Sequence, residues 1–294
     1  MRIVLTGATG FLGSALTSKL LADGHSVVAV SRSPQKAKDR LGVEAAVSWD
    51  ALDEVFSSPV DAVVHLAGET VQGRWNARKV EEVRASRLTT TAKVVEAIDR
   101  AATQPKVLIS ASGIGFYGDA ADAELRESSP PGDDYFAELC VEWESLAASA
   151  PCRVALMRFG IILGRDGGAL NVMLLPAKAG ISGPLGGGQQ WWSWVALDDA
   201  VGSIVHALHA ENVNGPVNVV SPEPVRQKQF NAVLCRKLNR PAFVPAPAFA
   251  LKLVLGMFAT EVLSSKRVIP HALTASGYQW VHSDLESALS AALG

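Results

Sequence analysis

Short runs of apolar residues recur along the first half of the chain, separated by stretches in which apolar residues have helical spacing. The runs that have the length of buried strands are 3–5, 27–30, 45–49, 62–66, 106–110 and 153–157. Helical spacing is found at 14–21, 76–102 and 135–148. Strands and helices that alternate in this way form a parallel sheet covered on both faces, with ligands beyond the carboxyl ends of the strands. The pattern therefore predicts an α/β fold with a Rossmann-type, doubly wound parallel sheet.

The second half of the chain is less regular, with glycine-rich segments between its apolar ones. We expect a helix at 169–179, another helix that ends near His209, and a further strand at 217–220. The chain therefore returns to the sheet. The domains expected from this pattern are a Rossmann-type domain, 1–160 with returns near 192–220, and a smaller C-terminal domain, 161–294.

Two local features of this half lead to further expectations. Asp198 or Asp199 is expected to cap the helix that ends near His209, because aspartate is a favoured N-cap residue. The stretch 242–258 is the most apolar of the chain, but two prolines and a lysine interrupt it. It is interpreted as a packed helix and its approach, not as a membrane span.

Three glycines mark the turn between the first strand and the first helix. Gly7 lets the chain leave the strand sharply, Gly10 lets the backbone approach a pyrophosphate, and Gly13 lets the helix pack closely on the sheet. The helix N-terminus offers free N–H groups and the positive end of its dipole to phosphate groups. The motif predicts dinucleotide binding, and its alternative is a glycine-rich turn without a ligand.

The ends of two strands bear on which dinucleotide binds. Ser31 and Arg32 follow the second strand, where NAD-binding proteins carry an acidic residue for the ribose 2′-hydroxyl. Arg32 can instead pair with a 2′-phosphate, which predicts NADP(H), and the alternative is a solvated surface arginine. Asp50, after the third strand, has two interpretations that stay open: a contact with the adenine amino group, or a helix start together with Asp53.

The fourth and fifth strands end in small and polar residues, beside which a dinucleotide could lie. His65 is expected to face the core, and Arg84 and Arg87 lie about one turn apart, so that they share a helix face. The further candidate cofactor contacts are Leu66, Ala67, Gly68, Ser110, Ala111 and Ile161.

Composition narrows the class of partner. The 294 residues carry a net charge of −2, which gives no electrostatic footprint for nucleic acid or for an anionic membrane. Cys140, Cys152 and Cys235 are odd in number and lack metal-ligand spacing, so we expect reduced thiols in a cytoplasmic protein and no metal site. No signal peptide is visible. A small molecule is the expected partner.

Several longer segments carry a family resemblance. They are TGATGFLG (6–13), HLAGE (65–69), SRLTTT (86–91), ISASGIGFYG (109–118), PPGDDYFAELCVEWE (130–144), RFGIILGRDGGAL (158–170) and GPLGGGQQWWSWVALDDA (183–200). They resemble the extended short-chain dehydrogenase/reductase superfamily, and more narrowly an atypical epimerase-like subgroup (NAD-dependent epimerase/dehydratase-like). The segments SPEPVRQKQF (221–230) and PAFVPAPAFALKLVLG (241–256) look like the subgroup's C-terminal domain.

The resemblance implies NAD(P) bound by the first domain, a substrate under the second, and a homodimer by analogy. The residues that fall on the dinucleotide turn and on the wall beside the cofactor are Gly7, Gly10, Phe11, Leu12, Gly13, Leu66, Ala67 and Gly68. The superfamily's catalytic serine falls on Ser112 and its tyrosine acid/base on Tyr135, with Tyr117 as the next candidate acid. Arg87 stands where many members carry asparagine, which implies a contact on the cofactor side.

One position departs from this pattern. The superfamily pairs its tyrosine with a lysine four residues later, and here that residue is Leu139. An ammonium group near the phenol would lower its pKa, so without it Tyr135 is expected to donate a proton but to be a poor base. Tyr135 as a helix-start residue facing a cleft is the alternative.

The tryptophans at 191, 192 and 194 also allow two interpretations. If this segment is a strand, Trp192 and Trp194 face the same side. They either form an aromatic wall over a substrate, within a mobile loop 183–194, or pack in a core at the domain junction.

Two functions therefore stay open. One is an NADP(H)-dependent oxidoreductase or epimerase-like enzyme that acts on a small polar substrate, such as a nucleotide sugar. The other is a non-catalytic NADP(H)-binding sensor or scaffold, which the missing lysine at Leu139 favours.

Overall fold

A sheet of seven parallel strands lies at the centre of the computed structural model, which describes residues 1–71, 73–165 and 167–294. Its strand order is β11-β7-β5-β4-β1-β2-β3. The strands are β1 Arg2–Thr6, β2 Ser26–Val30, β3 Ala45–Val47, β4 Ala62–His65, β5 Val107–Gly113, β7 Arg153–Phe159 and β11 Gly215–Val219. The expected doubly wound parallel sheet is confirmed, with strand ends that differ from the expected ones by a few residues at most.

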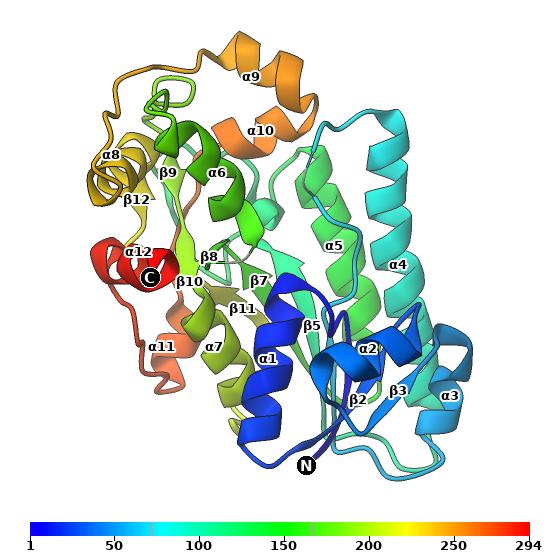
Figure 1. Cartoon of the computed structure of the whole chain (residues 1–294). Coiled ribbons are helices and arrows are strands. Elements are labelled where there is room, and N and C mark those ends of the chain that lie inside the picture. Colours follow the sequence, from blue (N-terminus) through cyan, green and yellow to red (C-terminus); the bar gives the residue numbers. More distant parts are fainter. Residues whose placement is uncertain (72, 166) are drawn as a thin grey trace.

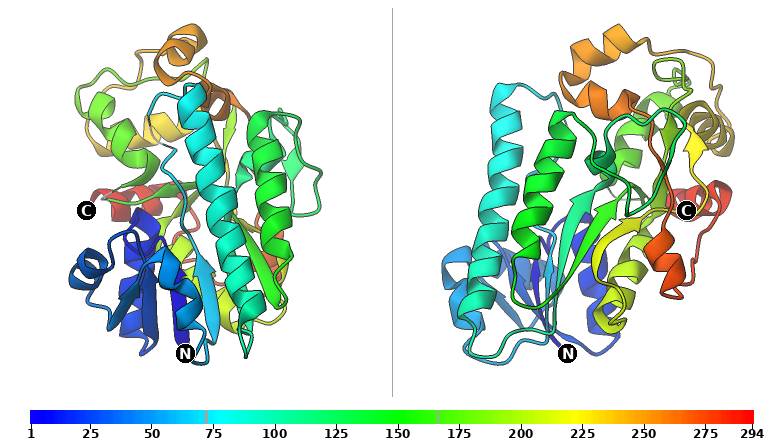
Figure 2. Two further views of the ribbon diagram at one scale, coloured as in Figure 1. Left: turned by 90° about the vertical axis from the view of Figure 1, so that its right-hand side faces the viewer. Right: turned by 180° about the vertical axis from the view of Figure 1, so that it is seen from behind.

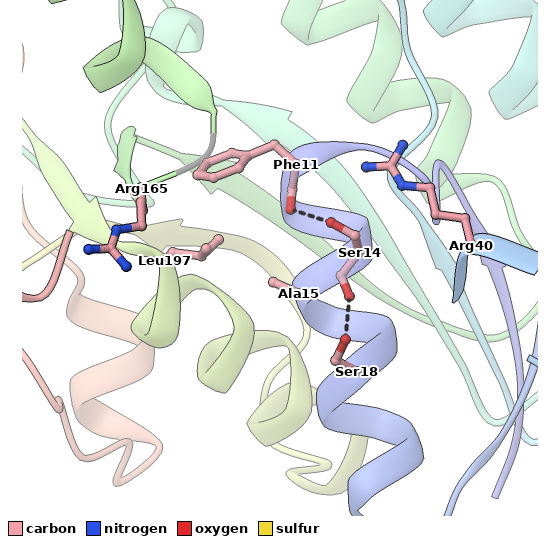
Figure 3. Close-up of a pocket in the computed structure, with 7 residues that line it drawn as sticks. All are labelled: Phe11, Ser14, Ala15, Ser18, Arg40, Arg165 and Leu197. Carbon is pink, nitrogen blue, oxygen red and sulfur yellow. Dashed lines mark hydrogen bonds between the residues drawn. The ribbon is translucent and has the colours of Figure 1, made fainter. Parts of the chain in front are cut away.

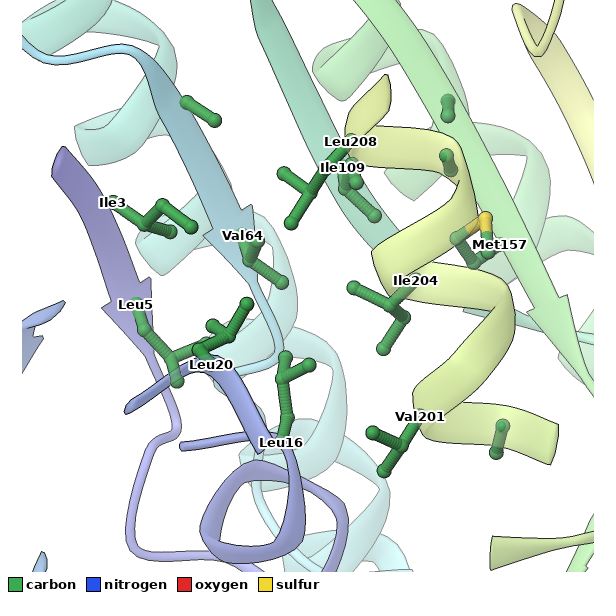
Figure 4. Close-up of a cluster of buried hydrophobic side chains, with 14 of the residues drawn as sticks. Ile3, Leu5, Leu16, Leu20, Val64, Ile109, Met157, Val201, Ile204 and Leu208 are labelled. Atoms are coloured by element: carbon green, nitrogen blue, oxygen red, sulfur yellow. The ribbon is translucent and has the colours of Figure 1, made fainter. Parts of the chain in front are cut away.

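Helices cover both faces of this sheet, as the continuous apolar runs of its strands require (Figures 1 and 2). On one face, Leu16 and Leu20 of α1 (Phe11–Ala22) and Ile204 of α7 (Leu197–His209) share one core with Leu5 of β1, Val64 of β4 and Met157 of β7 (Figure 4). The helices that cover the other face are α3 Leu52–Val55, α4 Ala77–Arg100 and α5 Tyr135–Ala148. The short helix α2 (Pro34–Leu41) links β2 to β3.

The strand order reverses between β1 and β4, which are neighbours although two strands separate them in the chain. The chain runs from β1 toward β3 on one side and from β4 toward β11 on the other. Dinucleotides bind outside the carboxyl ends of the strands at such a reversal. The reversal therefore places the crevice over Thr6 of β1 and His65 of β4.

A second layer of helices and short strands continues the fold beyond the sheet. Its elements are β6 Glu124–Leu125, β8 Ile161–Leu163, α6 Gly168–Lys178, β9 Trp191–Trp192, β10 Trp194–Ala196, β12 Val225–Arg226, α8 Gln227–Lys237, α9 Ala248–Leu255, α10 Phe258–Leu263, β13 Arg267–Val268, α11 His271–Ala275 and α12 Leu285–Leu293. Buried residues of α6, α8, α12 and β10 share a separate core. Between these elements the chain crosses back, so α7 packs on the main sheet and β11 forms its edge.

Two expectations about this half are wrong. Helix α7 has Ala196 as its N-cap and no side-chain cap. The carboxylate of Asp199 is instead fully buried and accepts hydrogen bonds from the backbone N–H groups of Val281 and His282 at 2.7 and 2.9 Å. Asp199 therefore fastens the C-terminal segment to α7. The apolar stretch 242–258 does contain a helix, α9, but none of its residues is buried.

No helix among the described residues is both long and apolar enough to cross a membrane.

Candidate functional site

The turn between β1 and α1 requires glycine at two positions for steric reasons. Gly7 has φ +69°, and a Cβ there would lie 2.7 Å from the carbonyl group of Leu66. A Cβ on Gly13 would lie 2.2 Å from the Gly7 oxygen. Gly10 is less crowded, since its Cβ would lie 3.2 Å from the same oxygen. Gly7 and Gly13 therefore build the turn, and a side chain at Gly10 requires only a small shift of the Gly7 carbonyl group.

The N-terminus of α1 is open toward the crevice. Gly10 is the N-cap of α1, and no side chain caps its first amides. Uncapped N–H groups at a helix N-terminus attract anions, which the helix dipole further stabilises. The backbone at Gly10, Phe11 and Leu12 thus fits a pyrophosphate.

The side chain of Phe11 points away from this turn (Figure 3). A Cβ on Gly167 or Gly168 would lie within 2.9 Å of its ring, so the ring packs directly against these glycines. It also lines a groove of about 380 Å³ between α1, Arg40 and Arg165. Only the backbone of Phe11 therefore remains for a dinucleotide.

Arg32 and Ser31 lie at the end of β2, as expected. The Ser31 hydroxyl accepts a hydrogen bond from the Ser33 backbone N–H at 3.1 Å, and so shapes the turn into α2. Arg32 is exposed and forms no ion pair with any carboxylate that the structure describes. Its positive charge helps to lower the pKa of Glu69 across the crevice, although Lys79 contributes most to that shift. Arg32 is thus available to an anion.

Asp50 lies on the first turn of a 3-10 helix, Trp49–Ala51, and its side chain is 94% exposed. Its carboxylate is 3.8 Å from the Lys93 ammonium group. Asp53 similarly lies in the first turn of α3. The helix-start interpretation therefore agrees with this geometry, whereas the adenine contact stays a prediction.

The wall after β4 is held by hydrogen bonds to Thr6. The Ala67 backbone N–H donates to the Thr6 hydroxyl at 3.1 Å, and the Leu66 N–H donates to the Thr6 carbonyl at 3.3 Å. His65 is fully buried, with its ring nitrogens 2.7 Å from the Thr6 hydroxyl and 2.9 Å from the Thr91 hydroxyl. Burial lowers the pKa of His65 to about 4. The expectation that His65 faces the core is confirmed.

The guanidinium group of Arg87 lies behind this wall. A Cβ on Gly68 would be 3.6 Å from it. Its Nη1 donates to the backbone carbonyls of Glu69 and Val83 at 3.2 and 3.1 Å, and it lies 5.2 Å from the ring centre of Trp143. No carboxylate among the described residues pairs with it, because Glu69 binds Lys79 at 2.8 Å. Arg87 therefore places a positive charge beside Gly68 that no acidic side chain neutralises.

Tyr135 begins α5, directly after its N-cap Asp134. Its hydroxyl donates to the Val80 carbonyl at 3.1 Å. Burial raises the pKa of the Tyr135 phenol, although the nearby charges of Arg84 and Arg87 oppose this shift. Tyr135 is therefore protonated at neutral pH and suits the role of proton donor.

The position of the missing lysine is apolar. Leu139 is 4% exposed and packs with Trp75, Val83 and Phe136. Cys140 beside it is buried, and burial raises the pKa of its thiol to about 12. Neither residue can supply the charge of the lysine.

The environment of Ser112 corrects its assignment as the catalytic serine. Ser112 is buried, and its hydroxyl donates to the Glu144 carboxylate at 2.6 Å. Glu144 forms a buried ion pair with Arg158, with two hydrogen bonds of 2.8 and 2.7 Å. The hydroxyl is thus directed into the interior between β5, α5 and β7.

Tyr117 requires a correction for a similar reason. It is 3% exposed, and its hydroxyl donates to Asn218 Oδ1 at 2.7 Å while it accepts from Arg158 Nη1 at 2.9 Å. Both hydrogen-bond positions of the phenol are therefore filled within the core. Tyr117 joins η2 (Ile114–Tyr117) to β11 and does not act as a substitute acid.

Trp192 and Trp194 face the same side, as expected, and both are buried in the core of the second layer. The interpretation as an aromatic wall over a substrate is wrong for these two rings. Trp191 differs, since its ring lies 4.1 Å from the guanidinium group of Arg226 and 5.1 Å from that of Arg267.

Two of the remaining predicted cofactor contacts, Ser110 and Ala111, lie within β5, which continues to Gly113, and the third, Ile161, begins β8. Ser110 is fully buried in β5, with its hydroxyl 3.4 Å from the Ala111 carbonyl. Ala111 is half-buried, as is Ile161 at the start of β8. Contacts of these three residues with a cofactor stay predictions.

Two features of the site were not predicted from the sequence. The loop before α4 is fixed to the second layer at Trp75, whose backbone N–H donates to the Leu255 carbonyl at 2.9 Å. A Cβ on Gly256 would lie 2.2 Å from the Trp75 carbonyl oxygen. The second feature is an ion pair between the buried Lys266 and the half-buried Glu261, 3.0 Å apart and next to Gly115. In the sequence, Lys266 is one of two adjacent basic residues after two serines, which gives no sign of burial.

Comparison with family models gives two matches. Residues 3–220 match the NAD-dependent epimerase/dehydratase family, and residues 246–292 match a domain of unknown function, DUF1731. The first match includes the seven strands of the main sheet.

Several curated proteins are similar over nearly the whole chain. The epimerase family protein SDR39U1 of Homo sapiens is 38% identical over 297 residues, which cover 98% of each chain. The chloroplastic homologue of Arabidopsis thaliana is 40% identical over 99% of this chain and 86% of its own. The epimerase family protein YfhF of Bacillus subtilis is 34% identical over 99% and 97%.

Solved structures agree with these matches. The crystal structure of human SDR39U1 (isoform 2) with NADPH has a TM-score of 0.92 at 37% identity and covers 100% of this chain and 99% of that one. A nucleoside-diphosphate sugar epimerase from Corynebacterium glutamicum has a TM-score of 0.80 at 31% identity, over 100% of this chain and 58% of that one. UDP-glucuronic acid 4-epimerase from Bacillus cereus has the same fold, with a TM-score of 0.78 at 18% identity.

Proposed function

Because the chain belongs to the NAD-dependent epimerase/dehydratase family, we propose that it binds NADP(H) over the β1–α1 turn and reduces a carbonyl group of a small polar substrate. The observation that carries the binding proposal is the uncapped N-terminus of α1 above a turn that only glycine can form at Gly7 and Gly13. The human relative crystallised with NADPH supports the same ligand.

The choice of NADP(H) over NAD(H) rests on Arg32. Its guanidinium group is exposed and unpaired among the described residues, at the strand end where an acidic residue would select NAD. A guanidinium group can bind a 2′-phosphate through two parallel hydrogen bonds. Arg32 does not weaken the binding of NAD. The expected preference for NADP(H) comes only from its attraction to the additional 2′-phosphate.

The direction of the reaction follows from the protonation state of Tyr135. When bound, the nicotinamide ring supplies or accepts a hydride. Reduction of a carbonyl needs a proton donor, and Tyr135 holds its proton at neutral pH because burial raises its pKa. Oxidation needs a base, and neither Leu139 nor Cys140 lowers the pKa of the phenol. Reduction is therefore the favoured direction. The substrate, for example a nucleotide sugar, would be held between Tyr135 and the second domain.

A specific observation also favours a second function, a sensor or scaffold that binds NADP(H) without turnover. Ser112 is bound to Glu144 and cannot orient a substrate carbonyl, and Leu139 removes the lysine charge. Tyr135 is then the one predicted catalytic side chain that is only half-buried, and its hydroxyl bonds to the Val80 backbone carbonyl.

The test of cofactor binding is a fluorescence titration of the purified protein with NADPH and with NADH. The Gly10→Val variant should retain its circular dichroism spectrum and lose NADPH binding, because a side chain there would occupy the place of the phosphate. NADPH oxidation, followed at the nicotinamide absorbance with a panel of small polar carbonyl compounds, then separates an enzyme from a sensor. A folded Gly10→Val protein with unchanged affinity would contradict the proposed site.

A further inference from the structure

Helix α9 exposes an apolar surface at the end of the molecule opposite the N-terminus (Figure 1). None of its residues is buried, and Phe249 and Leu253 are 75% and 71% exposed. These two residues are four positions apart, so they lie on one face of the helix. Val254 beside them is also exposed. An eight-residue helix with this composition would ordinarily bury its apolar face against another surface.

A neighbouring segment extends this surface. The chain after α6 runs beside the approach to α9, with hydrogen bonds from the Val244 N–H to the Ser182 carbonyl and from the Ala246 N–H to the Pro184 carbonyl. Phe243 in this approach is 75% exposed. We call the combined surface the apical face, and its residues are Ile181, Phe243, Val244, Phe249, Leu253 and Val254.

The two chain segments that form the apical face carry charges of one sign. The sequence contains no aspartate or glutamate at 167–197 or at 224–260. Lys178, Arg240 and Lys252 lie in these segments and are exposed. None of the three forms an ion pair with a described carboxylate. Although the whole chain has a net charge of −2, the apical face is therefore apolar and its exposed charges are cationic.

We propose that the apical face docks on the surface of a lipid bilayer that contains anionic headgroups. Phenylalanine and leucine side chains would enter the boundary between headgroups and acyl chains, while the three cations would lie among the anionic headgroups. This is a peripheral contact and needs no membrane-spanning helix. It revises the expectation, drawn from net charge alone, that the chain has no affinity for an anionic membrane.

The charges favour this occupant over a second copy of the chain. A symmetric contact between two apical faces would bring their cations together, and neither face supplies a carboxylate to pair with them. Helix α9 also projects from the end of the molecule (Figure 2), and the segment before it contains three prolines. A projecting helix can lie on a flat fluid surface. A bilayer needs no complementary pocket to receive it.

The experiment measures co-sedimentation of the full-length protein with vesicles. One vesicle type is phosphatidylcholine alone, and the other is an equal mixture of phosphatidylcholine and phosphatidylglycerol. The protein should sediment with the mixed vesicles only, and added salt should weaken this binding. The double variant Phe249→Glu/Leu253→Glu should reduce the partition coefficient by roughly tenfold or more, because two apolar anchors are lost and two negative charges are added. Both positions are exposed, so the variant should fold.

The matched control is Val281→Glu, since Val281 is 67% exposed and lies outside the apical face. This variant should bind the mixed vesicles as the parent does. The proposal is overturned if the parent fails to sediment with the mixed vesicles, or if Val281→Glu loses as much binding as the double variant. It is also overturned if light scattering shows a parent dimer that Phe249→Glu/Leu253→Glu converts to a monomer, because a second copy would then cover the face. The result does not depend on NADP(H) binding.

Discussion

The hydroxyl of Ser112 lies 2.6 Å from Oε1 of Glu144, although 32 positions separate the two residues in the chain. The same carboxylate receives two hydrogen bonds from Arg158, whose guanidinium group is buried. A serine expected to orient a substrate thus helps to solvate a buried ion pair. Substitutions of Ser112 in β5 and of Glu144 in α5 should therefore change stability more than cofactor binding.

The first prediction concerns this network and stability. Glu144→Gln should lower the free energy of unfolding by about 3–5 kcal/mol, because it leaves the Arg158 charge buried without a partner. Ser112→Ala removes one hydrogen bond to a charged group and should cost about 1.5–3 kcal/mol. Urea unfolding monitored by tryptophan fluorescence measures both. NADPH affinity of folded Ser112→Ala should equal that of the parent, and a loss of affinity without a loss of stability would restore Ser112 to the site.

The second prediction concerns the proton donor. Tyr135→Phe should reduce kcat/KM for carbonyl reduction by about 10²–10⁴-fold, the usual contribution of a general acid. Tyr117→Phe is the matched control, because its hydroxyl is enclosed by Arg158 and Asn218, and this variant should lose stability while keeping its activity. Since the pKa of Tyr135 is raised, reduction should stay constant through neutral pH and decline only at strongly alkaline pH. Oxidation should increase toward alkaline pH.

If Tyr135→Phe keeps full activity, Tyr135 is a structural helix-start residue. If neither the parent nor the variant turns over any carbonyl compound while both bind NADPH, the sensor function is supported.

The third prediction concerns cofactor selection. Arg32→Asp should reverse the preference for NADPH over NADH, because it removes the cation for the 2′-phosphate and adds a carboxylate that accepts from the 2′-hydroxyl. The contribution of Arg32 should be roughly tenfold to a hundredfold in Kd, as for a charge-assisted bidentate contact. Arg40→Asp provides the control, since Arg40 is also exposed but lines the groove on the outer side of α1. Calorimetry that finds equal affinities of the parent for both cofactors would contradict this assignment.

The fourth prediction concerns Arg87, which we expect to contact the half of the cofactor that lies over β4 and β5. Arg87→Met should weaken NADPH binding by roughly tenfold, as the loss of a hydrogen bond to a charged donor implies. Binding of 2′,5′-ADP, which lacks the nicotinamide half, should stay unchanged. Arg84→Met is the control, because Arg84 lies on the same helix face and pairs with Glu142 instead. Equal losses for both ligands would show that Arg87 supports the fold of the wall and not the cofactor.

The fifth prediction concerns the pH dependence of stability. His65 has a pKa near 4 in the folded protein and an ordinary value of 6.5 when unfolded, so the unfolded chain binds more protons between these values. The contribution of His65 to the free energy of unfolding is at most about 3 kcal/mol. It is fully present above pH 6.5 and is lost as the pH falls toward 4. His65→Asn should be less stable than the parent at pH 7 and should show a smaller decline on acidification. An identical decline in parent and variant would mean that other groups dominate.

Much of the fold could be predicted from local pattern. The apolar runs that become β1, β2, β4, β5 and β7 are long enough and apolar enough to be buried whatever surrounds them. The glycine turn is equally local, since Gly7 must adopt a positive φ where the strand ends. His65 in the core followed from its place in such a run.

The roles of polar side chains in the site were decided by contacts far along the chain. Tyr117 meets Asn218 across 101 positions, and Asp199 meets Val281 across 82. A hydroxyl or carboxylate at a strand end or helix start looks the same in sequence whether it faces a ligand or a buried partner. The family resemblance assigns roles to single positions, so it could not reveal that Ser112 is hydrogen-bonded to Glu144.

The sequence by itself determined the alternation of strands and helices in the first half, the glycine turn and the missing lysine, because these depend on residues that are neighbours in the chain. Only the tertiary structure decided that Trp192 and Trp194 are core residues, that Ser112 and Tyr117 face Glu144 and Asn218, and that α9 is left exposed. These outcomes depend on which elements pack together, and a buried polar group takes whichever partner that packing brings within hydrogen-bond distance.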